Sequence, residues 1–243
     1  MDELQRRERE RRERILTLVP DRRLRYEWRV EDEAVLSRLR PRPGERILDA
    51  GCGIGRITRE LLRAGCDVVA LDFALARLCH LRAHAPSSPQ GRLALAQADL
   101  TRLPLAATAG FEAVVCTQVL EHLPTAEARQ ALLTSLHRLL RPGGRLLLTV
   151  YNYSESWRGR GEPKQGIHPS GIFYHAYVAA ELTAELSDFV HVEVCGIINL
   201  LPHTYRLFPL LGSLGRACDR RASRRSALSH KWGHLLLAHA TAA

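Results

Sequence analysis

Residues 46–58 read RILDAGCGIGRIT and combine three signals of local structure. The apolar run Ile47–Ala50 predicts a short buried strand, and the apolar pattern that follows the glycines predicts a helix. Between them stand Gly51, Gly53 and Gly55, which allow a sharp backbone turn and a close approach by a ligand. Because the free N–H groups of the helix point at the same place, the stretch predicts a nucleotide-type site at the carboxyl edge of a parallel sheet.

The order of residues in this turn distinguishes between nucleotide ligands. A dinucleotide-binding fingerprint reads G-x-G-x-x-G, and its backbone cradles a pyrophosphate. Here Asp49 precedes glycines that alternate, in the order D-x-G-x-G-x-G. A carboxylate at this point repels a pyrophosphate but suits a ligand that carries an ammonium and a sulfonium group. In this respect the sequence resembles the class I S-adenosylmethionine-dependent methyltransferases, whose first motif has this form.

Acidic residues at the ends of the next two predicted strands extend the resemblance. Asp72 ends the predicted strand 67–72, where its carboxylate can accept hydrogen bonds from both ribose hydroxyls of an adenosine. Phe73 can lie against the face of the adenine. Asp99 can accept from the adenine amino group, and the backbone N–H of Leu100 can serve a ring nitrogen. The two strand ends therefore predict the adenosine half of the cofactor site.

Two later segments complete the family pattern. Residues 116–123, CTQVLEHL, look like the family segment that passes under the methionine portion and ends in Glu-His. Residues 139–146, LLRPGGRL, match the turn before the family's fifth strand. From the residues and the resemblance we predict S-adenosyl-L-methionine as cofactor. The predicted cofactor-binding residues are Arg29, Asp49, Gly51, Cys52, Gly53, Gly55, Asp72, Phe73, Asp99, Leu100, Thr117 and Gln118.

The alternation of strands and helices after residue 46 predicts the fold class. Near-continuous apolar strands separated by helices indicate a parallel sheet that is covered on both faces. Together with the resemblance, this predicts an α/β protein with a doubly wound, mostly parallel seven-stranded sheet, the Rossmann-like methyltransferase fold. The predicted strands are 47–50, 67–72, 93–99, 111–116, 145–150, 190–200 and 233–238. The predicted helices are 3–18, 24–39, 56–64, 74–84, 127–140 and 177–188.

The predicted domain organisation separates a leading segment from the methyltransferase domain. Residues 1–40 are expected to form helices that pack, as in the resembling family, over the mouth of the cofactor site. Residues 41–243 are expected to form the methyltransferase domain, in which 151–176 and 201–231 are additions that face the substrate. In this arrangement Arg29 can reach the carboxylate of the methionine portion, although a surface arginine beside Glu33 is an equally simple interpretation.

Composition narrows the class of protein and its compartment. The chain has 243 residues, 46% hydrophobic and 25% charged, which suits one globular domain with additions. No apolar run approaches the roughly 18 residues of a membrane span, and the N-terminus lacks the apolar core of a secretion signal. We therefore expect a cytoplasmic protein. The six cysteines are scattered without a C-x-x-C pair, which predicts reduced thiols in the core and no metal site.

The net charge of +9 has two interpretations. Residues 216–231 hold six basic side chains against one acid, Asp219, which suits a nucleic-acid or anionic membrane surface. Alternatively, the excess reflects a sequence that prefers arginine throughout. We favour the second interpretation, so that nucleic acid is a possible partner but not the expected one, and no transmembrane segment is expected.

The resemblance implies a methyl transfer by in-line displacement, which needs alignment more than covalent help. A hydroxyl acceptor must also lose a proton, and His122, His168 and His175 are the histidines placed to accept it. The aromatic and apolar residues of the additions favour a small, fairly apolar acceptor, as in the quinone- and natural-product-type members. The glycine-rich segment 151–176 is predicted to be a mobile lid over that acceptor.

Other functions remain open on the sequence alone. An RNA methyltransferase would use the basic C-terminal region for phosphates. An enzyme that methylates protein side chains would need no further motif. A non-catalytic regulator that binds S-adenosylmethionine would keep the glycine turn and lack residues for an acceptor.

Overall fold

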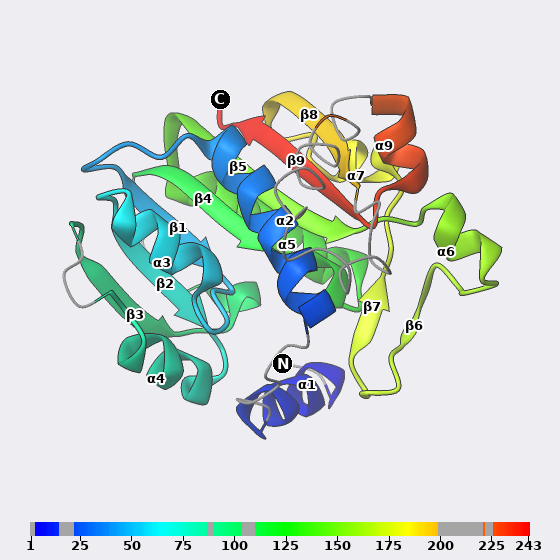
Figure 1. The fold of residues 1–243 in the computed structure, drawn as a ribbon, viewed down its shortest axis with the longest axis horizontal. Coiled ribbons are helices and arrows are strands. Elements are labelled where there is room, and N and C mark those ends of the chain that lie inside the picture. The colour runs from blue at the N-terminus through cyan, green and yellow to red at the C-terminus, as the bar shows by residue number, and fades with distance from the viewer. Residues whose placement is uncertain (1–2, 15–21, 87–89, 104–109, 199–220, 222–225) are drawn as a thin grey trace.

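The computed structural model describes residues 3–14, 22–86, 90–103, 110–198, 221 and 226–243 (Figure 1). At its centre is a seven-stranded sheet of order β3-β2-β1-β4-β5-β9-β8. The strands are β1 (Arg46–Ala50), β2 (Asp67–Asp72), β3 (Leu93–Gln97), β4 (Phe111–Thr117), β5 (Leu140–Tyr151), β8 (Val190–Ile197) and β9 (Leu235–Thr241). Strands β1 to β5 pair in parallel, and β9 runs antiparallel to both of its neighbours, β5 and β8. The prediction of a doubly wound, mostly parallel seven-stranded sheet is confirmed.

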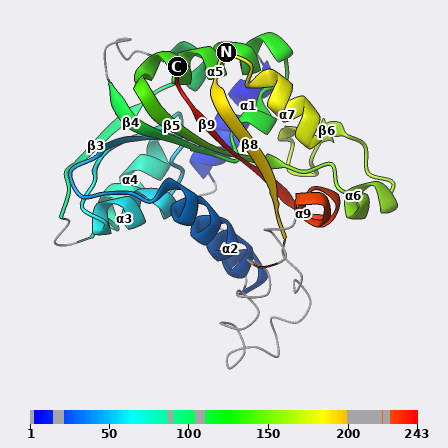
Figure 2. The same ribbon diagram turned by 90° about the horizontal axis from the view of Figure 1, so that it is seen from above.

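Helices cover both faces of the sheet, as Figure 2 shows from above. The helices are α1 (Glu3–Arg14), α2 (Arg22–Leu39), α3 (Arg56–Arg63), α4 (Leu75–Ala83), α5 (Ala126–Leu139), α6 (Glu155–Gly159), α7 (Ala179–Glu185) and α9 (Ser226–Trp232). One buried apolar cluster joins the sheet to α2, α3 and α4, and a second joins it to α5 and α7. The central strands β1, β2 and β4 are mostly apolar because both of their faces are largely buried in these clusters.

The fifth strand begins earlier than the sequence pattern predicts. Helix α5 ends at Leu139, close to the predicted position, but β5 starts at the next residue and includes the Pro-Gly-Gly segment. Gly143 has a φ of +72°, which glycine adopts without strain, and its N–H donates to the carbonyl oxygen of Ala242 at 3.0 Å. The segment therefore forms an irregular start of the strand, because it gains a partner in the residue that follows β9 (Leu235–Thr241).

The segment 151–176 has regular structure where the sequence predicts a long loop. Ser154 caps α6 by accepting the N–H of Trp157 at 3.3 Å. Beyond it, β6 (Gln165–Ile167) and β7 (Phe173–His175) pair in an antiparallel hairpin. The hairpin turn is closed by a hydrogen bond of 2.7 Å from the N–H of Gly171 to the carbonyl of His168. A cap and a glycine turn inside the segment supply these local hydrogen bonds, and its predicted role as a mobile lid stays a prediction.

Parts of the predicted additions fall beyond what the structure describes. Residues 15–18 of the first predicted helix and most of the segment 201–231 lie outside the described residues. Among the helices that are described, none combines the length and the apolarity that crossing a membrane requires.

A buried carboxylate, Glu31, fixes α2 against the carboxyl edge of the sheet. The side chain is fully buried, and its Oε1 accepts from Oγ1 of Thr149 on β5 at 2.6 Å. Its Oε2 accepts from Nε2 of Gln118 at 2.6 Å and from Nη2 of Arg56 on α3 at 2.7 Å. Three separate elements are thereby tied to one helix, which positions the wall of the site described below.

Removal of the Glu31 carboxylate should destabilise the whole protein. Glu31→Ala leaves the buried guanidinium of Arg56 with one acid fewer and two polar side chains without their acceptor. We expect the free energy of unfolding to fall by about 3–5 kcal/mol. Arg29→Ala, on the same helix, removes only an exposed pair with Glu33 and should change it by less than about 1 kcal/mol. Urea unfolding monitored by circular dichroism measures both, and equal losses for the two variants would contradict the role of Glu31.

A second buried acid, Glu121, lies in the short 3₁₀ helix η2 (Leu120–His122) that follows β4. It is fully buried, and within the described part of the chain neither carboxylate oxygen has a hydrogen-bond partner in another residue. Burial raises the pKa of Glu121 well above its ordinary value of 4.5. The folded protein therefore holds a proton here that the unfolded chain releases.

This linkage predicts how stability depends on pH. Because the folded-state pKa is raised, the stability contributed by Glu121 is fully present below pH 4.5 and is lost as the pH rises towards that pKa. Glu121→Gln removes the titration, so between about pH 5 and about pH 7.5 the variant should gain stability relative to the wild type. Urea unfolding at the two pH values measures the difference. Glu127→Gln, at an exposed position of α5, is the control, and a parallel pH response of Glu121→Gln and wild type would contradict the prediction.

Candidate active site

The glycine turn between β1 and α3 forms the floor of the site. Gly51, Gly53 and Gly55 all have positive φ, at +81°, +54° and +78°, a conformation that side chains disfavour. A Cβ at Gly51 would lie 2.4 Å from Cγ2 of Val119, so this glycine allows close packing. At Gly53, leaving aside its chain neighbours, the one atom of a described residue within 4 Å of such a Cβ is Nη1 of Arg77, at 3.3 Å. Gly53 therefore presents bare backbone to a cavity, which fits the close approach of a ligand.

Two carboxylates shape this turn from below and from the side. Asp49 is buried at the end of β1 and accepts a hydrogen bond from the hydroxyl of Thr58, and burial raises its pKa to about 6. Asp72, at the end of β2, accepts from the N–H of Gly53 at 2.8 Å through Oδ2. Its Oδ1 accepts from the N–H of Ala74 at 2.9 Å. Asp72 is thus held in one orientation beside the turn and keeps further lone pairs for a ligand.

The third predicted acid also lies at a strand end with a fixed orientation. Oδ1 of Asp99 accepts from both the N–H and the hydroxyl of Thr101, at 2.9 and 2.7 Å, and so caps η1 (Leu100–Arg102). Its Oδ2 forms no hydrogen bond with a described residue. The carbonyl oxygen of Phe73 accepts from the side chain of Gln97 at 2.9 Å, which fixes the segment after β2. Phe73 and Asp99 therefore lie at the same end of the site.

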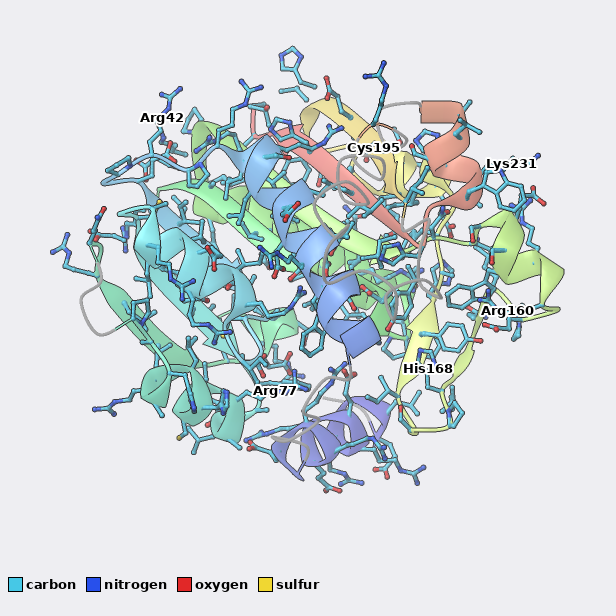
Figure 3. The ribbon with its side chains drawn as sticks, in the orientation of Figure 1. Arg42, Arg77, Arg160, His168, Cys195 and Lys231 are labelled. Carbon is cyan, nitrogen blue, oxygen red and sulfur yellow. The ribbon has the colours of Figure 1, made fainter. Side chains whose placement is uncertain are left out.

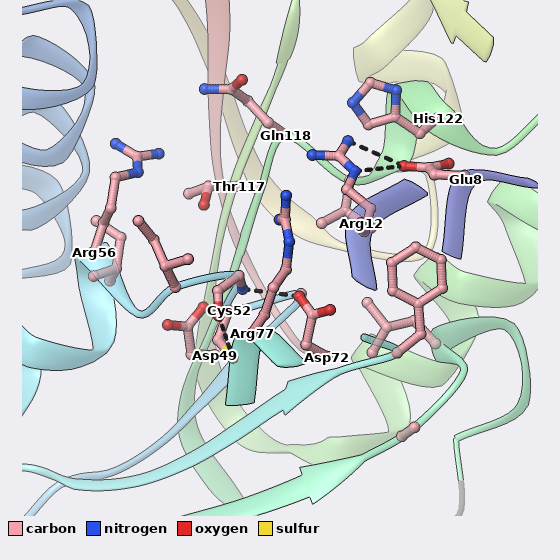
Figure 4. Close-up of a pocket in the computed structure, with 18 of the residues that line it drawn as sticks. Glu8, Arg12, Asp49, Cys52, Arg56, Asp72, Arg77, Thr117, Gln118 and His122 are labelled. Carbon is pink, nitrogen blue, oxygen red and sulfur yellow. Dashed lines mark hydrogen bonds and ion pairs between the residues drawn. The ribbon is translucent and has the colours of Figure 1, made fainter. Parts of the chain in front are cut away.

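These elements enclose a cavity of about 260 Å³, shown in Figure 4. Among the predicted cofactor residues, those that line it are Asp49, Gly51, Cys52, Gly53, Asp72, Phe73, Asp99, Leu100, Thr117 and Gln118. Gly55 does not line the cavity, and Arg29 lies outside it with its side chain 66% exposed, 3.5 Å from Glu33. The predicted role of Arg29 in cofactor binding stays a prediction, which this geometry does not favour. Its placement matches the alternative interpretation, a surface arginine beside Glu33.

The charged and aromatic lining residues that were not predicted from the sequence are Glu8, Arg12, Trp28, Arg56 and Arg77. Arg56 directly follows the glycine turn, and this position in the sequence is enough to predict that it lies at the site. Its guanidinium lies 5.2 Å from the ring of Trp28 and donates to the carbonyl of Trp28 at 3.1 Å. Glu8 and Arg12 belong to α1, in which most side chains are charged. The sequence pattern therefore does not distinguish these two as residues of the site. Only the packing of α1 against α4 brings them to the cavity.

One of the three predicted catalytic histidines lines the cavity. Nδ1 of His122 donates to the carbonyl oxygen of Phe173 at 2.8 Å, because a carbonyl oxygen can only accept. The lone pair therefore resides on Nε2, which has no hydrogen-bond partner among the described residues. Burial, together with the charge of Arg12, lowers the pKa of His122 to about 3, so the ring is neutral near pH 7. A neutral imidazole in the cavity wall can accept a proton or a hydrogen bond.

The other two histidines lie beyond the cavity wall. His175 is buried, and its ring nitrogens face Oε1 of Glu181 at 2.8 Å and Oε1 of Gln165 at 3.3 Å. It joins β7 to α7, and its predicted catalytic role stays a prediction that this geometry does not favour. His168 is half-buried, and its ring lies 4.5 Å from Tyr174 and 5.9 Å from Tyr151. Figure 3 shows His168 on the hairpin side of α1 and Arg77 on the α4 side.

Comparison with known proteins identifies the domain that carries this site. Residues 48–148 match the family model described as a methyltransferase domain. A probable S-adenosylmethionine-dependent methyltransferase of Mycobacterium tuberculosis is 32% identical over 193 residues, which cover 76% of this chain and 65% of the relative. A ubiquinone biosynthesis O-methyltransferase of Xanthomonas oryzae is 34% identical over 109 residues, 45% of this chain and 44% of the relative. A demethylmenaquinone methyltransferase of Beutenbergia cavernae is 35% identical over 125 residues, 51% of this chain and 47% of the relative. The chain thus spans 65% of the first relative's length and less than half of the other two.

Solved structures share the fold at low sequence identity. An S-adenosylmethionine-dependent methyltransferase from Mesorhizobium loti superimposes with a TM-score of 0.60 at 20% identity, over 89% of this chain and 99% of that structure. A possible histamine N-methyltransferase from Thermotoga maritima gives a TM-score of 0.61 at 15% identity, over 90% of both chains. The seven-stranded sheet of this chain therefore has the fold of these structures. Residues 48–148 thus match a methyltransferase domain, and the chain is similar to S-adenosylmethionine-dependent methyltransferases over 76% of its own length.

Proposed function

We propose that the protein transfers a methyl group from S-adenosylmethionine to a small, fairly apolar acceptor, at a hydroxyl oxygen. The observation that carries this proposal is the joint placement of the Asp72 carboxylate and the neutral His122 ring on one cavity. The first is suited to the ribose of the cofactor and the second to the proton of the acceptor. The bare backbone of Gly53 lines the same cavity, which leaves room for the chain between ribose and carboxylate.

The cofactor would be held by the residues that line the cavity from the sheet edge. Asp72 would accept from the ribose hydroxyls, and its two backbone hydrogen bonds hold it ready to do so. Phe73 and Asp99 would bound the adenine, and Thr117 with Gln118 would line the methionine portion. When bound, S-adenosylmethionine supplies an electrophilic methyl group on a sulfonium centre. The protein then has to align an acceptor in line with that methyl group.

His122 would take the proton of the acceptor hydroxyl. Its pKa of about 3 makes the ring a weak base, but a hydroxyl becomes strongly acidic as a bond to the methyl carbon forms. A weak base is therefore sufficient late in the displacement. The hydrogen bond from Nδ1 to Phe173 keeps Nε2 free as the acceptor. His122 is the histidine we favour for this role over His168 and His175.

The acceptor would lie towards the hairpin. Phe173, whose carbonyl binds His122, belongs to the segment 151–176. The ring of Tyr151 lies 5.7 Å from His122 and 5.9 Å from His168, so aromatic surface extends from the cavity to β7. This surface supports an apolar acceptor, and two relatives are named for methylation of quinone precursors or menaquinone precursors. We propose that 1–40, 151–176 and 201–231 face the acceptor and that 41–243 form the transferase domain.

Two alternative functions differ from this proposal in a measurable way. An RNA methyltransferase would bind phosphates with the basic residues of 216–231, most of which lie outside the described residues. A non-catalytic regulator would bind the cofactor and transfer no methyl group. The neutral His122 ring in the cavity wall favours an enzyme over a regulator, because binding of the cofactor does not require a base.

Substitution of Asp72 tests the cofactor site. We expect the protein to bind S-adenosylmethionine and S-adenosylhomocysteine in calorimetry, and not to bind NAD. Asp72→Ala should weaken binding by about 1–3 kcal/mol, because it removes hydrogen bonds to a charged acceptor. Asp67→Ala, at the other end of β2, removes only a pair with Arg92 and should leave affinity unchanged. Thermal unfolding of both variants checks the fold, and absence of binding by the wild type would end the proposal.

A labelling experiment tests the class of acceptor. The protein is incubated with S-adenosylmethionine that carries a radioactive methyl group and with separated lipid, RNA, protein and small-molecule fractions of a cell lysate. We expect the label in solvent-extractable small molecules. Label in RNA that ribonuclease releases and that salt suppresses steeply would favour the RNA alternative. His122→Gln should keep the affinity for S-adenosylhomocysteine and slow the transfer of label, and an unchanged rate would remove His122 from the mechanism.

A further inference from the structure

Three guanidinium groups line the cavity, and two of them have acidic partners. Arg56 donates to Glu31 at 2.7 Å and forms a second ion pair with Asp32. Arg12 donates to the carboxylate of Glu8 at 3.0 Å, one helical turn away on α1. The charges of these two arginines are therefore neutralised by acidic side chains of the protein itself. The third, Arg77, differs.

Arg77 extends from α4 into the cavity between the glycine turn and α1, as Figure 4 shows. Its Nη1 stands 3.3 Å from the place that a Cβ on Gly53 would occupy. Its Nε is buried, and among the described residues it has no hydrogen-bond partner. No described carboxylate pairs with the guanidinium. Burial and the nearby charge of Arg12 lower the pKa of Arg77, and the more distant Asp72 and Glu8 do not offset them.

A partly buried cation of this kind needs a counter-charge. An unpaired charge that is withdrawn from water is costly, and a hydrogen-bonded anion removes most of that cost. The acids beside the turn form no ion pair with Arg77: Asp49 accepts from Thr58, and Asp72 is oriented by two backbone N–H groups. The missing anion is therefore expected to arrive with the ligand.

We propose that Arg77 binds the carboxylate of the methionine portion of S-adenosylmethionine. The inference rests on the proposed function, because it takes that cofactor as the occupant of the cavity. In the cofactor the ammonium and the sulfonium are positive, which suits the acid-lined wall, and the carboxylate is the sole anionic group. A guanidinium can bind it with two parallel hydrogen bonds. Arg77 then has the role that the sequence reading gave to Arg29.

The position of Arg77 agrees with this assignment. Its guanidinium lies over Gly53, on the segment of backbone assigned to the chain between ribose and carboxylate. Arg56 is a less suitable partner, because a carboxylate would have to displace Glu31 or Asp32 from its guanidinium. Arg12 would likewise have to leave Glu8. Arg77 binds the carboxylate without the loss of an existing ion pair.

Decarboxylated S-adenosylmethionine is the probe that isolates this contact. It keeps the adenosine, the sulfonium and the amino group and lacks only the carboxylate. Calorimetry should show that the wild type binds S-adenosylmethionine at least about tenfold more tightly than the probe. Arg77→Met should lose this preference and bind both compounds with similar affinity. Arg77→Lys, which keeps the charge without the planar fork, should restore part of the preference.

The controls separate this inference from the proposed function. Arg82→Met, at an exposed position of the same helix, should keep the wild-type preference. If Arg77→Met keeps it as well, or if the wild type binds both compounds equally, the assignment of Arg77 is overturned while the cofactor site stands. If the wild type binds neither compound, the proposed function itself fails. Should Arg77→Met not fold, the wild-type preference and Arg77→Lys decide the question.

Discussion

The buried carboxylate of Glu31 is the contact on which the cofactor side of the molecule depends. It accepts hydrogen bonds from side chains on α3, on β5 and at the end of β4, so one group holds α2 to three elements of the sheet edge. A buried charge with this many donors is costly to disturb, because Gln118 and Thr149 would lose their acceptor and Arg56 one of its two acidic partners. The same contact orients Arg56 and places Gln118 in the cavity wall. The contacts that pack α2 against the sheet therefore also position residues of the site.

Hydrogen bonds within the protein also hold the site in place. Asp72 uses one oxygen to hold the N–H of Gly53 and the other to hold the N–H of Ala74. The carboxylate therefore fixes the turn, and the turn fixes the carboxylate. Because the group that would meet the ribose is already immobile, little conformational entropy is lost on binding. The absence of a side chain at Gly53 matters as well, because a side chain there would project towards the cavity and contact Arg77.

Sequence reading succeeded where the information is local along the chain. A strand, an acid and alternating glycines define the turn within a few residues, and the acids at the ends of β2 and β3 follow from strand boundaries. The reading failed where a role depends on contacts between distant elements. Arg77 reaches the cavity because α4 lies beside the turn, and Arg12 does so because α1 packs on α4. The hairpin of residues 165–175 was missed for a different reason, since its glycines and polar residues are equally common in irregular loops.

Helix α1 connects the two halves of the proposed reaction. Glu13 accepts from the N–H groups of Leu75 and Ala76 at 2.7 and 2.8 Å, so that α1 caps the start of α4. This docking sets the position of Arg12 relative to both Arg77 and His122, whose pKa values its charge lowers. An anion bound at Arg77 would weaken that positive field and make the imidazole a better base. Burial, the main cause of the low pKa of His122, would remain, so the proposed carboxylate at Arg77 would offset only the part that the arginine charges contribute.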